Sequence, residues 1–142
     1  MLKVTHGTEA ELIEQARFVR EMVFIGEQGI APELEYDELD PECIHFVGML
    51  DDEPVTTARL RPIGEGIGKV ERVATLAAVR GNGYAKELML AIEDVARIHE
   101  LYELKLGAQL TALPFYERLG YEAFGDEFLD AEIPHRMMKK SW

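Results

Sequence analysis

The stretch VRGNGYAKELM, residues 79–89, places two glycines directly before a run of residues with helical spacing. A glycine inside a helix costs about 1 kcal/mol relative to alanine. At a helix entrance it permits positive φ and lets a ligand approach the bare backbone. The first turn of a helix also has unpaired N–H groups and a partial positive charge, which together bind phosphate. Gly81 and Gly83, flanked by Arg80 and Lys86, therefore indicate either a glycine-capped turn or a phosphate-binding loop.

Neither common nucleotide-binding motif explains this stretch. A dinucleotide fingerprint would need a third glycine where Lys86 stands, and a Walker loop is absent. A second glycine-rich stretch, GEGIG at residues 64–68, precedes a predicted strand rather than a helix. Val70 follows Lys69 there in place of serine or threonine. We therefore interpret residues 64–68 as a hairpin turn, where glycine suits positive φ.

An amphipathic helix is predicted near the start of the chain. Thr8 and Glu11 have the spacing of a capping box, and apolar residues then recur at helical spacing. These apolar residues are Leu12, Ala16, Val19 and Val23. Residues 27–42 follow as a loop or short helix punctuated by Pro32 and Pro41.

Alternating strands and helices fill the rest of the chain. The predicted strands are residues 43–50, 54–63, 69–77, 101–108, 121–130 and 133–140. The long helix after the glycine stretch runs to about His99, with Leu88, Ile92, Val95 and His99 along one face. Residues 110–121 form a short helix that ends near Gly120. This order predicts an α/β (α+β) fold, a mixed sheet with helices packed on its faces.

Composition narrows the function classes. A chain of 142 residues fits one domain, residues 1–142, and its formal net charge of -12 would repel the phosphates of nucleic acid and attract cations such as amines. No apolar run approaches the ~20 residues of a membrane span, and the start of the chain lacks the apolar stretch of a signal peptide. The single Cys43 cannot form an internal disulfide, which fits a reducing cytoplasm. The histidines show no metal-ligand spacing, so no metal is expected.

The glycine stretch resembles the central motif of the GNAT acetyltransferase superfamily, Gln/Arg-x-x-Gly-x-Gly/Ala, with Arg80, Gly83 and Ala85 at the defined positions. PFYERLGY, residues 114–121, resembles the later Phe-Tyr-x-x-x-Gly-Phe/Tyr signature of that family. The resemblance extends over essentially the whole chain, and residues 23–40 look more narrowly like the ElaA-like branch. It implies a mostly antiparallel, twisted sheet flanked by helices on both faces.

The resemblance also implies a site for acetyl-CoA. The backbone amides of one loop would hold the pyrophosphate, namely those of Arg80, Gly81, Asn82, Gly83, Tyr84, Ala85 and Lys86. The strand around Val73, Ala74 and Thr75 would pair with the pantetheine arm as an added strand does, and Gln109 would lie near the cofactor. This strand and the next would splay apart to form the acetyl cleft. Arg80 has an alternative role as a surface charge that neutralises nearby glutamates.

Acetyl transfer to an amine needs a base and an acid, because an amine with a pKa near 10.4 is protonated at neutral pH and the departing thiolate is better released as a thiol. The resemblance points to Tyr116 as the acid, with a place in the aromatic core as the alternative. Glu71 is the candidate base, directly or through a water, if burial raises its pKa. An ion pair of Glu71 with Arg59, Arg61 or Arg72 is the equally open alternative.

Three weaker candidates complete the sequence-based site. His45 alternates with Cys43 and Val47 on one strand face, so it would either reach the acceptor or serve as a structural histidine. Cys43 is interpreted as a small buried residue. The acidic segment, residues 33–42, would either guide a cationic amine or form a solvated loop. Its six carboxylates are Glu33, Glu35, Asp37, Glu38, Asp40 and Glu42.

The expected activity is that of an N-acyltransferase in which an amine attacks acetyl-CoA directly within a ternary complex. The acceptor is a small-molecule or peptide amine that the sequence does not identify. A non-catalytic acyl-CoA-binding or regulatory module is the alternative. Domains of this kind occur as monomers and as homodimers, and the sequence does not decide between the two states.

Overall fold

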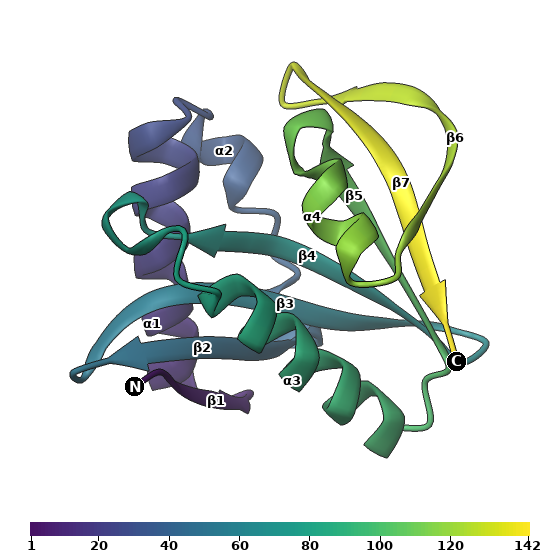
Figure 1. Cartoon of the computed structure of the whole chain (residues 1–142). Coiled ribbons are helices and arrows are strands. Elements are labelled where there is room, and N and C mark those ends of the chain that lie inside the picture. The colour runs from purple at the N-terminus through teal and green to yellow at the C-terminus, as the bar shows by residue number, and fades with distance from the viewer.

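Seven strands form one sheet in the order β1-β2-β3-β4-β5-β7-β6 in the computed structural model, which describes residues 1–142 (Figure 1). The strands are β1 (Lys3–Gly7), β2 (Ile44–Leu50), β3 (Glu53–Gly64), β4 (Ile67–Thr75), β5 (Glu103–Gln109), β6 (Glu122–Asp130) and β7 (Ile133–Ser141). All neighbouring pairs are antiparallel except β4 and β5, which are parallel. The predicted mixed, mostly antiparallel sheet is therefore confirmed.

Helices cover both faces of this sheet. The helices are α1 (Ala10–Arg20), its π-helical continuation η1 (Glu21–Glu27), α2 (Pro32–Glu35), α3 (Tyr84–Ile98) and α4 (Leu113–Arg118), with short 3₁₀ turns at Asp40–Glu42, Ala77–Val79 and Leu110–Ala112. Leu12 and Ala16 of α1 pack on Val47. The neighbouring Phe46 points to the opposite face, where it joins the main core with α3. Figure 1 shows α1 and α3 on the two sides of the sheet. No helix has the combination of length and apolar character that crossing a membrane requires.

The start of the chain differs from the sequence-based prediction. Residues 3–7 form β1, which the sequence did not indicate, and α1 begins at Ala10 after an N-cap at Glu9 that makes no side-chain capping bond. The predicted capping box of Thr8 and Glu11 is therefore wrong. Pairing of β1 with β2 keeps the chain extended as far as Gly7, so the helix starts later than the local pattern suggests.

The predicted hairpin turns are confirmed. Asp51 and Asp52 connect β2 to β3 with positive φ at both residues, and Glu65 and Gly66 connect β3 to β4 with φ of 58° and 74°. Two consecutive residues at positive φ characterise the tight turns that match strand twist. The GEGIG stretch is therefore a turn between strands, with no helix start that could bind a phosphate.

The parallel pair β4 and β5 holds together only at its beginning. Register pairs run from Ile67–Glu103 to Val70–Leu106 and then stop, although both strands continue. A β-bulge in β4 lies just beyond, where Arg72 adopts φ of 57° and the register with β3 shifts. A bulge bends its strand and increases the local twist. The two strands consequently diverge, as Figure 1 shows, and the predicted splay is confirmed.

Candidate functional site

A cavity of about 760 Å³ occupies the space between the diverging strands. Residues 69–75 of β4 and 106–109 of β5 line its sides. The loop before α3 borders it, as do α4, η1 with the segment that follows it, and the connection between β6 and β7. A cavity of this size falls within the usual range of small-molecule and cofactor sites.

Six consecutive backbone amides, from Gly81 to Lys86, donate no hydrogen bond to another backbone group of the protein. The amide of Arg80 bonds the carbonyl of Ala77, and the first amide to bond across the start of α3 is that of Glu87, to the carbonyl of Gly83 at 3.0 Å. Five of the six residues line the cavity. Free N–H groups at the start of a 15-residue helix make this loop suited to an anion such as a phosphate.

The two glycines of this loop are needed for backbone conformation. Gly81 and Gly83 have φ of 84° and 78°, and a Cβ built on either would meet nothing within 4 Å. Asn82 stabilises the turn, because its side-chain amide donates to the carbonyl of Val79 at 2.8 Å. The positive φ of the two glycines and the bond from Asn82 therefore hold the loop in a conformation in which its amides stay unpaired.

The two cations of this loop differ in their partners. The guanidinium of Arg80 donates to Glu27 in η1 at 2.6 Å and to the carbonyl of Thr75 at 3.0 Å. Glu27 raises the pKa of Arg80, as the sequence-based alternative of a neutralising surface charge implies. Lys86 is exposed and makes no ion pair. Lys86 is therefore the cation left to interact with a bound anion.

The free edge of β4 lies against the cavity. Val73, Ala74 and Thr75 all line it, and none pairs with β5 because the parallel register ends at Val70. On the other edge β3 still pairs with Ala74 and Thr75. An extended ligand has room to add to the free edge as a strand would. Gln109 of β5 also lines the cavity, and its side-chain amide donates to the side chain of Gln28 at 3.1 Å.

Tyr116 lies on α4 and lines the cavity although only 7% of the residue is exposed. Its ring packs edge-on against Phe115 and Tyr121 with centroids 4.9 and 5.9 Å away. Burial raises the pKa of Tyr116 well above its usual value near 10, so the hydroxyl stays protonated. The side chain therefore belongs to the core and also forms part of the cavity wall.

Glu71 lines the cavity as an ion-paired carboxylate. Arg61 donates to its two oxygens at 3.1 and 3.2 Å, Arg59 donates at 3.3 Å, and the amine of Lys69 lies 3.5 Å away. Burial raises the pKa of Glu71, but the bonds from Arg61 and the charges of Arg59 and Lys69 outweigh it and hold the pKa below its ordinary value. The expected rise in this pKa is therefore wrong.

His45 is fully buried and does not line the cavity. Its Nε2 contacts the carbonyl of Asp40 at 2.9 Å, while Nδ1 has no partner, and burial lowers its pKa. His45 shares a face of β2 with Val47, as the alternation of the strand predicted, but the turn Asp40–Glu42 lies over His45 on that face. We therefore correct its assignment as an acceptor-binding residue. Cys43 is also buried, and burial raises its thiol pKa to about 11, so it remains a packed thiol.

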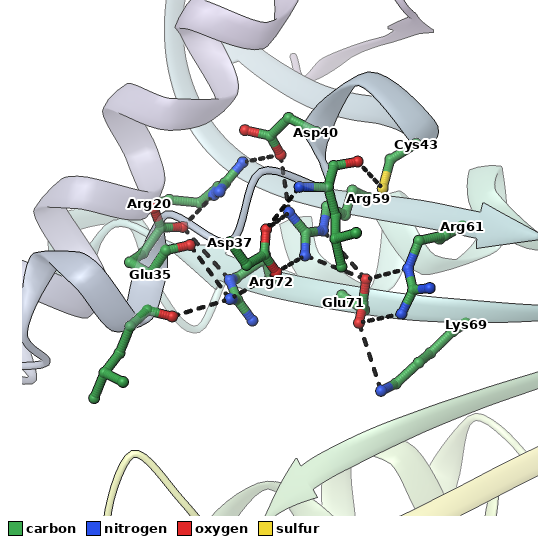
Figure 2. Close-up of polar contacts among 12 residues, drawn as sticks. Arg20, Glu35, Asp37, Asp40, Cys43, Arg59, Arg61, Lys69, Glu71 and Arg72 are labelled. Carbon is green, nitrogen blue, oxygen red and sulfur yellow. Dashed lines mark hydrogen bonds and ion pairs between the residues drawn. The ribbon is translucent and has the colours of Figure 1, made fainter.

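The acidic segment is not a solvated loop throughout. Glu35 and Asp40 are buried and Asp37 is half-buried, and all three pair with arginines (Figure 2). Arg20 and Arg59 both donate to Asp40, at 2.8 and 2.9 Å, and each of these arginines is 1% exposed. The other three carboxylates, Glu33, Glu38 and Glu42, are exposed. The predicted solvated loop is thus wrong for half of the segment.

A single group of linked charges, here called the ionic cluster, ties this segment to β4. Its members are Arg17, Arg20, Glu35, Asp37, Asp40, Arg59, Arg61, Lys69, Glu71 and Arg72. Arg72, at the bulge, donates to the carbonyls of Leu34 and Glu35 and to Asp37 at 3.1–3.3 Å. The segment that follows α1 is therefore fixed against the strand that lines the cavity.

Comparison with known proteins identifies the family. The model for the acetyltransferase (GNAT) domain matches residues 18–142. The chain belongs to the GNAT acetyltransferase family. This GNAT domain is similar to YjcF of Bacillus subtilis (strain 168), named as an uncharacterized N-acetyltransferase, with 38% identity over 98% of this chain and 99% of the relative.

Solved structures agree with that assignment. An acyl-CoA N-acyltransferase from Pseudomonas aeruginosa matches the GNAT domain with a TM-score of 0.86 and 26% identity, over 99% of this chain and 100% of the other. Escherichia coli ElaA matches with a TM-score of 0.89 and 23% identity, over 99% and 100% of the two chains, a likeness that shows the fold. The chain is thus a GNAT N-acetyltransferase that uses acetyl-CoA.

Sequence reasoning named Arg59, Arg61 and Arg72 as alternative partners of Glu71, but it missed Arg20 and the pairing of Arg59 with the acidic segment in this GNAT enzyme. Arg20 follows Val19 on the buried face of α1, and Arg59 lies between buried residues of β3. An arginine among buried apolar positions of a helix or strand usually has a carboxylate partner. That signal was present, but the partners lie 15 to 22 residues away and become visible only in the fold.

Proposed function

We propose that this N-acetyltransferase transfers an acetyl group from acetyl-CoA to an amine by direct attack within a ternary complex. The observation that supports this most strongly is the row of unpaired amides from Gly81 to Lys86 at the edge of the cavity. A diphosphate is the chemical group that such a row of amides at a helix start suits best. Lys86 would add charge to the same anion.

The position of the thioester follows from this anchoring. With the diphosphate at Gly81–Lys86, the pantetheine arm runs along the free edge at Val73–Thr75. Strand residues advance about 3.3 Å each, so the arm follows β4 back toward the bulge at Arg72. The acetyl group then lies near Tyr116 and Glu71, both of which line the cavity. A backbone N–H near Val73 would polarise the thioester carbonyl.

The proton transfers are assigned as follows. The amine first loses a proton to water, and the ionised Glu71 accepts a hydrogen bond from that water, since a carboxylate with a lowered pKa is a weak direct base. The neutral nitrogen attacks the carbonyl carbon and gives its second proton to the same water, which passes it to solvent, and the carbon–sulfur bond breaks. Tyr116 donates its proton to the departing sulfur and regains one from solvent. Holding both reactants in one cavity supplies much of the rate enhancement.

Two measurements test this function. Isothermal titration with acetyl-CoA should show one site per chain, and thiol release should require both acetyl-CoA and an amine. Binding without thiol release across a broad panel of amines would favour the non-catalytic acyl-CoA-binding module instead. Absence of binding by a folded protein would contradict the role of the amide row.

A further inference from the structure

The ionic cluster contains more cations than carboxylates. Six side chains are cationic, namely Arg17, Arg20, Arg59, Arg61, Lys69 and Arg72, and four are carboxylates, namely Glu35, Asp37, Asp40 and Glu71. His45, which touches the cluster, is buried and its lowered pKa keeps it neutral. The cluster therefore has an excess of two positive charges in a chain whose formal net charge is -12.

Part of this excess faces the cavity. Lys69 and Arg72 both line it, with side chains 35% and 21% exposed. The amine of Lys69 is 3.5 Å from Glu71 Oε2, an oxygen that already accepts from Arg61 at 3.2 Å, and Lys69 donates no hydrogen bond. The Nε of Arg72 makes no hydrogen bond, but it is buried and lies 3.5 Å from Glu35 Oε1. Lys69 thus keeps donors that no protein group uses, and Arg72 lines the same cavity three residues further along β4.

Several cations of the cluster lie next to one another in the sheet, in addition to their pairing with Glu71 and the acidic segment. Arg61 and Lys69 are direct neighbours across β3 and β4, and Lys105 is the neighbour of Lys69 on β5. Like charges opposite each other in a sheet are destabilising. An anion placed between Lys69 and Arg72 would compensate this repulsion, because charge-assisted hydrogen bonds to a carboxylate are among the stronger ones.

Large apolar side chains also line the cavity. Phe24, Ile30 and Leu34 line it from the segment after α1, and Phe128 and Ile133 line it from β6 and β7. Leu34 is 56% exposed and Phe128 is 37% exposed, although both are large apolar side chains. Exposed apolar side chains that border a cavity indicate a ligand with an apolar body.

We infer that the acceptor is an amine that also bears a carboxylate and an apolar body, as an apolar amino acid does, and that Lys69 and Arg72 bind the carboxylate. The inference rests on the proposed acetyl transfer. Polycationic amines are poor acceptors on this view, because arginines occupy the buried carboxylates of the acidic segment. Lys69 is then a specificity-determining residue.

Matched pairs of acceptors test the inference. Thiol release from acetyl-CoA is measured with phenylalanine and leucine, with their amides, and with spermidine. We expect kcat/KM for each acid to exceed that for its amide by about tenfold or more, which corresponds to one good ionic interaction, and spermidine to react least. In Lys69→Gln this preference should fall about tenfold through the KM of the acid, with the KM of acetyl-CoA unchanged.

Lys105→Gln is the matched control. Lys105 is the register neighbour of Lys69 with a similar exposure of 32%, yet it does not line the cavity. It should keep the wild-type preference. Each acid and its amide differ in the pKa of the amine. This difference is the same in every variant, so it cancels when the ratio of kcat/KM for acid and amide is compared between variants.

Any one of three results would overturn the inference. These are amides that match the acids in the wild type, a Lys69→Gln variant that keeps the wild-type ratio, and a Lys105→Gln variant that changes the ratio equally. If amines are acetylated without preference for acids, the inference fails while the proposed function holds. If acetyl-CoA binds but no amine releases thiol, the proposed function fails and the inference with it.

Discussion

Tyr116 borders the cavity although its side chain is nearly buried, and burial alone accounts for its raised pKa. In Tyr116→Phe we expect kcat to fall about a hundredfold, the lower part of the range for general acid catalysis, with little change in the affinity for acetyl-CoA. Titration calorimetry and thiol release measure the two effects. Tyr121→Phe is the control, because Tyr121 packs beside Tyr116 but donates to Glu93 and does not line the cavity. Equal losses in both variants would exclude Tyr116 as the acid.

Glu71 leads to a prediction about pH. Because its ion pairs hold the pKa below the ordinary value, Glu71 stays ionised above about pH 5. The acid limb of the pH profile of kcat/KM should therefore follow the pKa of the acceptor amine. It should move by roughly two pH units between an acceptor with a pKa near 8 and one near 10. An acid limb fixed between about pH 5 and 7 for both amines would instead identify a titrating base on the enzyme.

Single residues also show where sequence reasoning succeeds. The residues from Arg80 to Lys86 and Tyr116 were placed by short motifs, and the fold brings six of the seven loop residues and Tyr116 to one cavity. Of the two alternatives for His45, the structure shows a buried histidine outside the cavity, because strand alternation determines the face on which a side chain lies and not what covers that face. For Glu71 the sequence left the base and the ion pair with arginine equally open, and the fold shows the ion pair with Arg59 and Arg61 of the neighbouring strand.

The start of α3 is the element on which the proposed function depends. Gly83→Glu should weaken acetyl-CoA binding by at least roughly tenfold, because it places a negative charge beside the anion site. Gly125→Glu is the matched control. Gly125 has a similar φ of 74°, a Cβ added there would meet nothing within 4 Å, and the residue lies outside the cavity. Both variants lose about 1–2 kcal/mol through the left-handed backbone, so melting temperatures should match while the Kd values differ.

At the scale of elements, local pattern predicted the helices and hairpins well. The two turns, the long helix α3 and the strands from β2 to β7 follow from glycine positions and apolar alternation. β1 and the π-helical continuation of α1 were missed. A five-residue edge strand has a weak pattern and forms because β2 offers it a partner. Likewise the π-helix Glu21–Glu27 has no distinctive composition.

For the molecule as a whole, the ionic cluster makes stability depend on pH. Burial raises the pKa of Asp40, but the bonds from Arg20, Arg17 and Arg59 outweigh it and hold the pKa well below 3.8 in the folded state. Such a group stabilises the fold above its unfolded pKa and loses that contribution as pH falls through the folded pKa. The free energy of unfolding should therefore be constant above about pH 5 and decrease by roughly 2 kcal/mol or more on acidification below about pH 4.

Urea denaturation at about pH 7, 5 and 3.5 measures this dependence. Asp40→Asn should lose about 3–5 kcal/mol at neutral pH, because Arg20 and Arg59 then lack a buried counter-ion, and its remaining pH dependence should be smaller. Asp94→Asn is the control, since the side chain of Asp94 is 79% exposed and pairs only with Arg97. Identical pH dependence in Asp40→Asn and wild type would show that the cluster does not cause it.

The brief contact between β4 and β5 has a mechanical consequence. Four register pairs join the first four strands to the last three, so a hinge motion between the two half-sheets breaks few backbone bonds. A donor molecule lying along the free edge would supply the cross-links that the protein lacks there. Substrate binding would then stiffen the molecule about this hinge, and amide hydrogen exchange in Val73–Thr75 and Gly107–Gln109 would slow together.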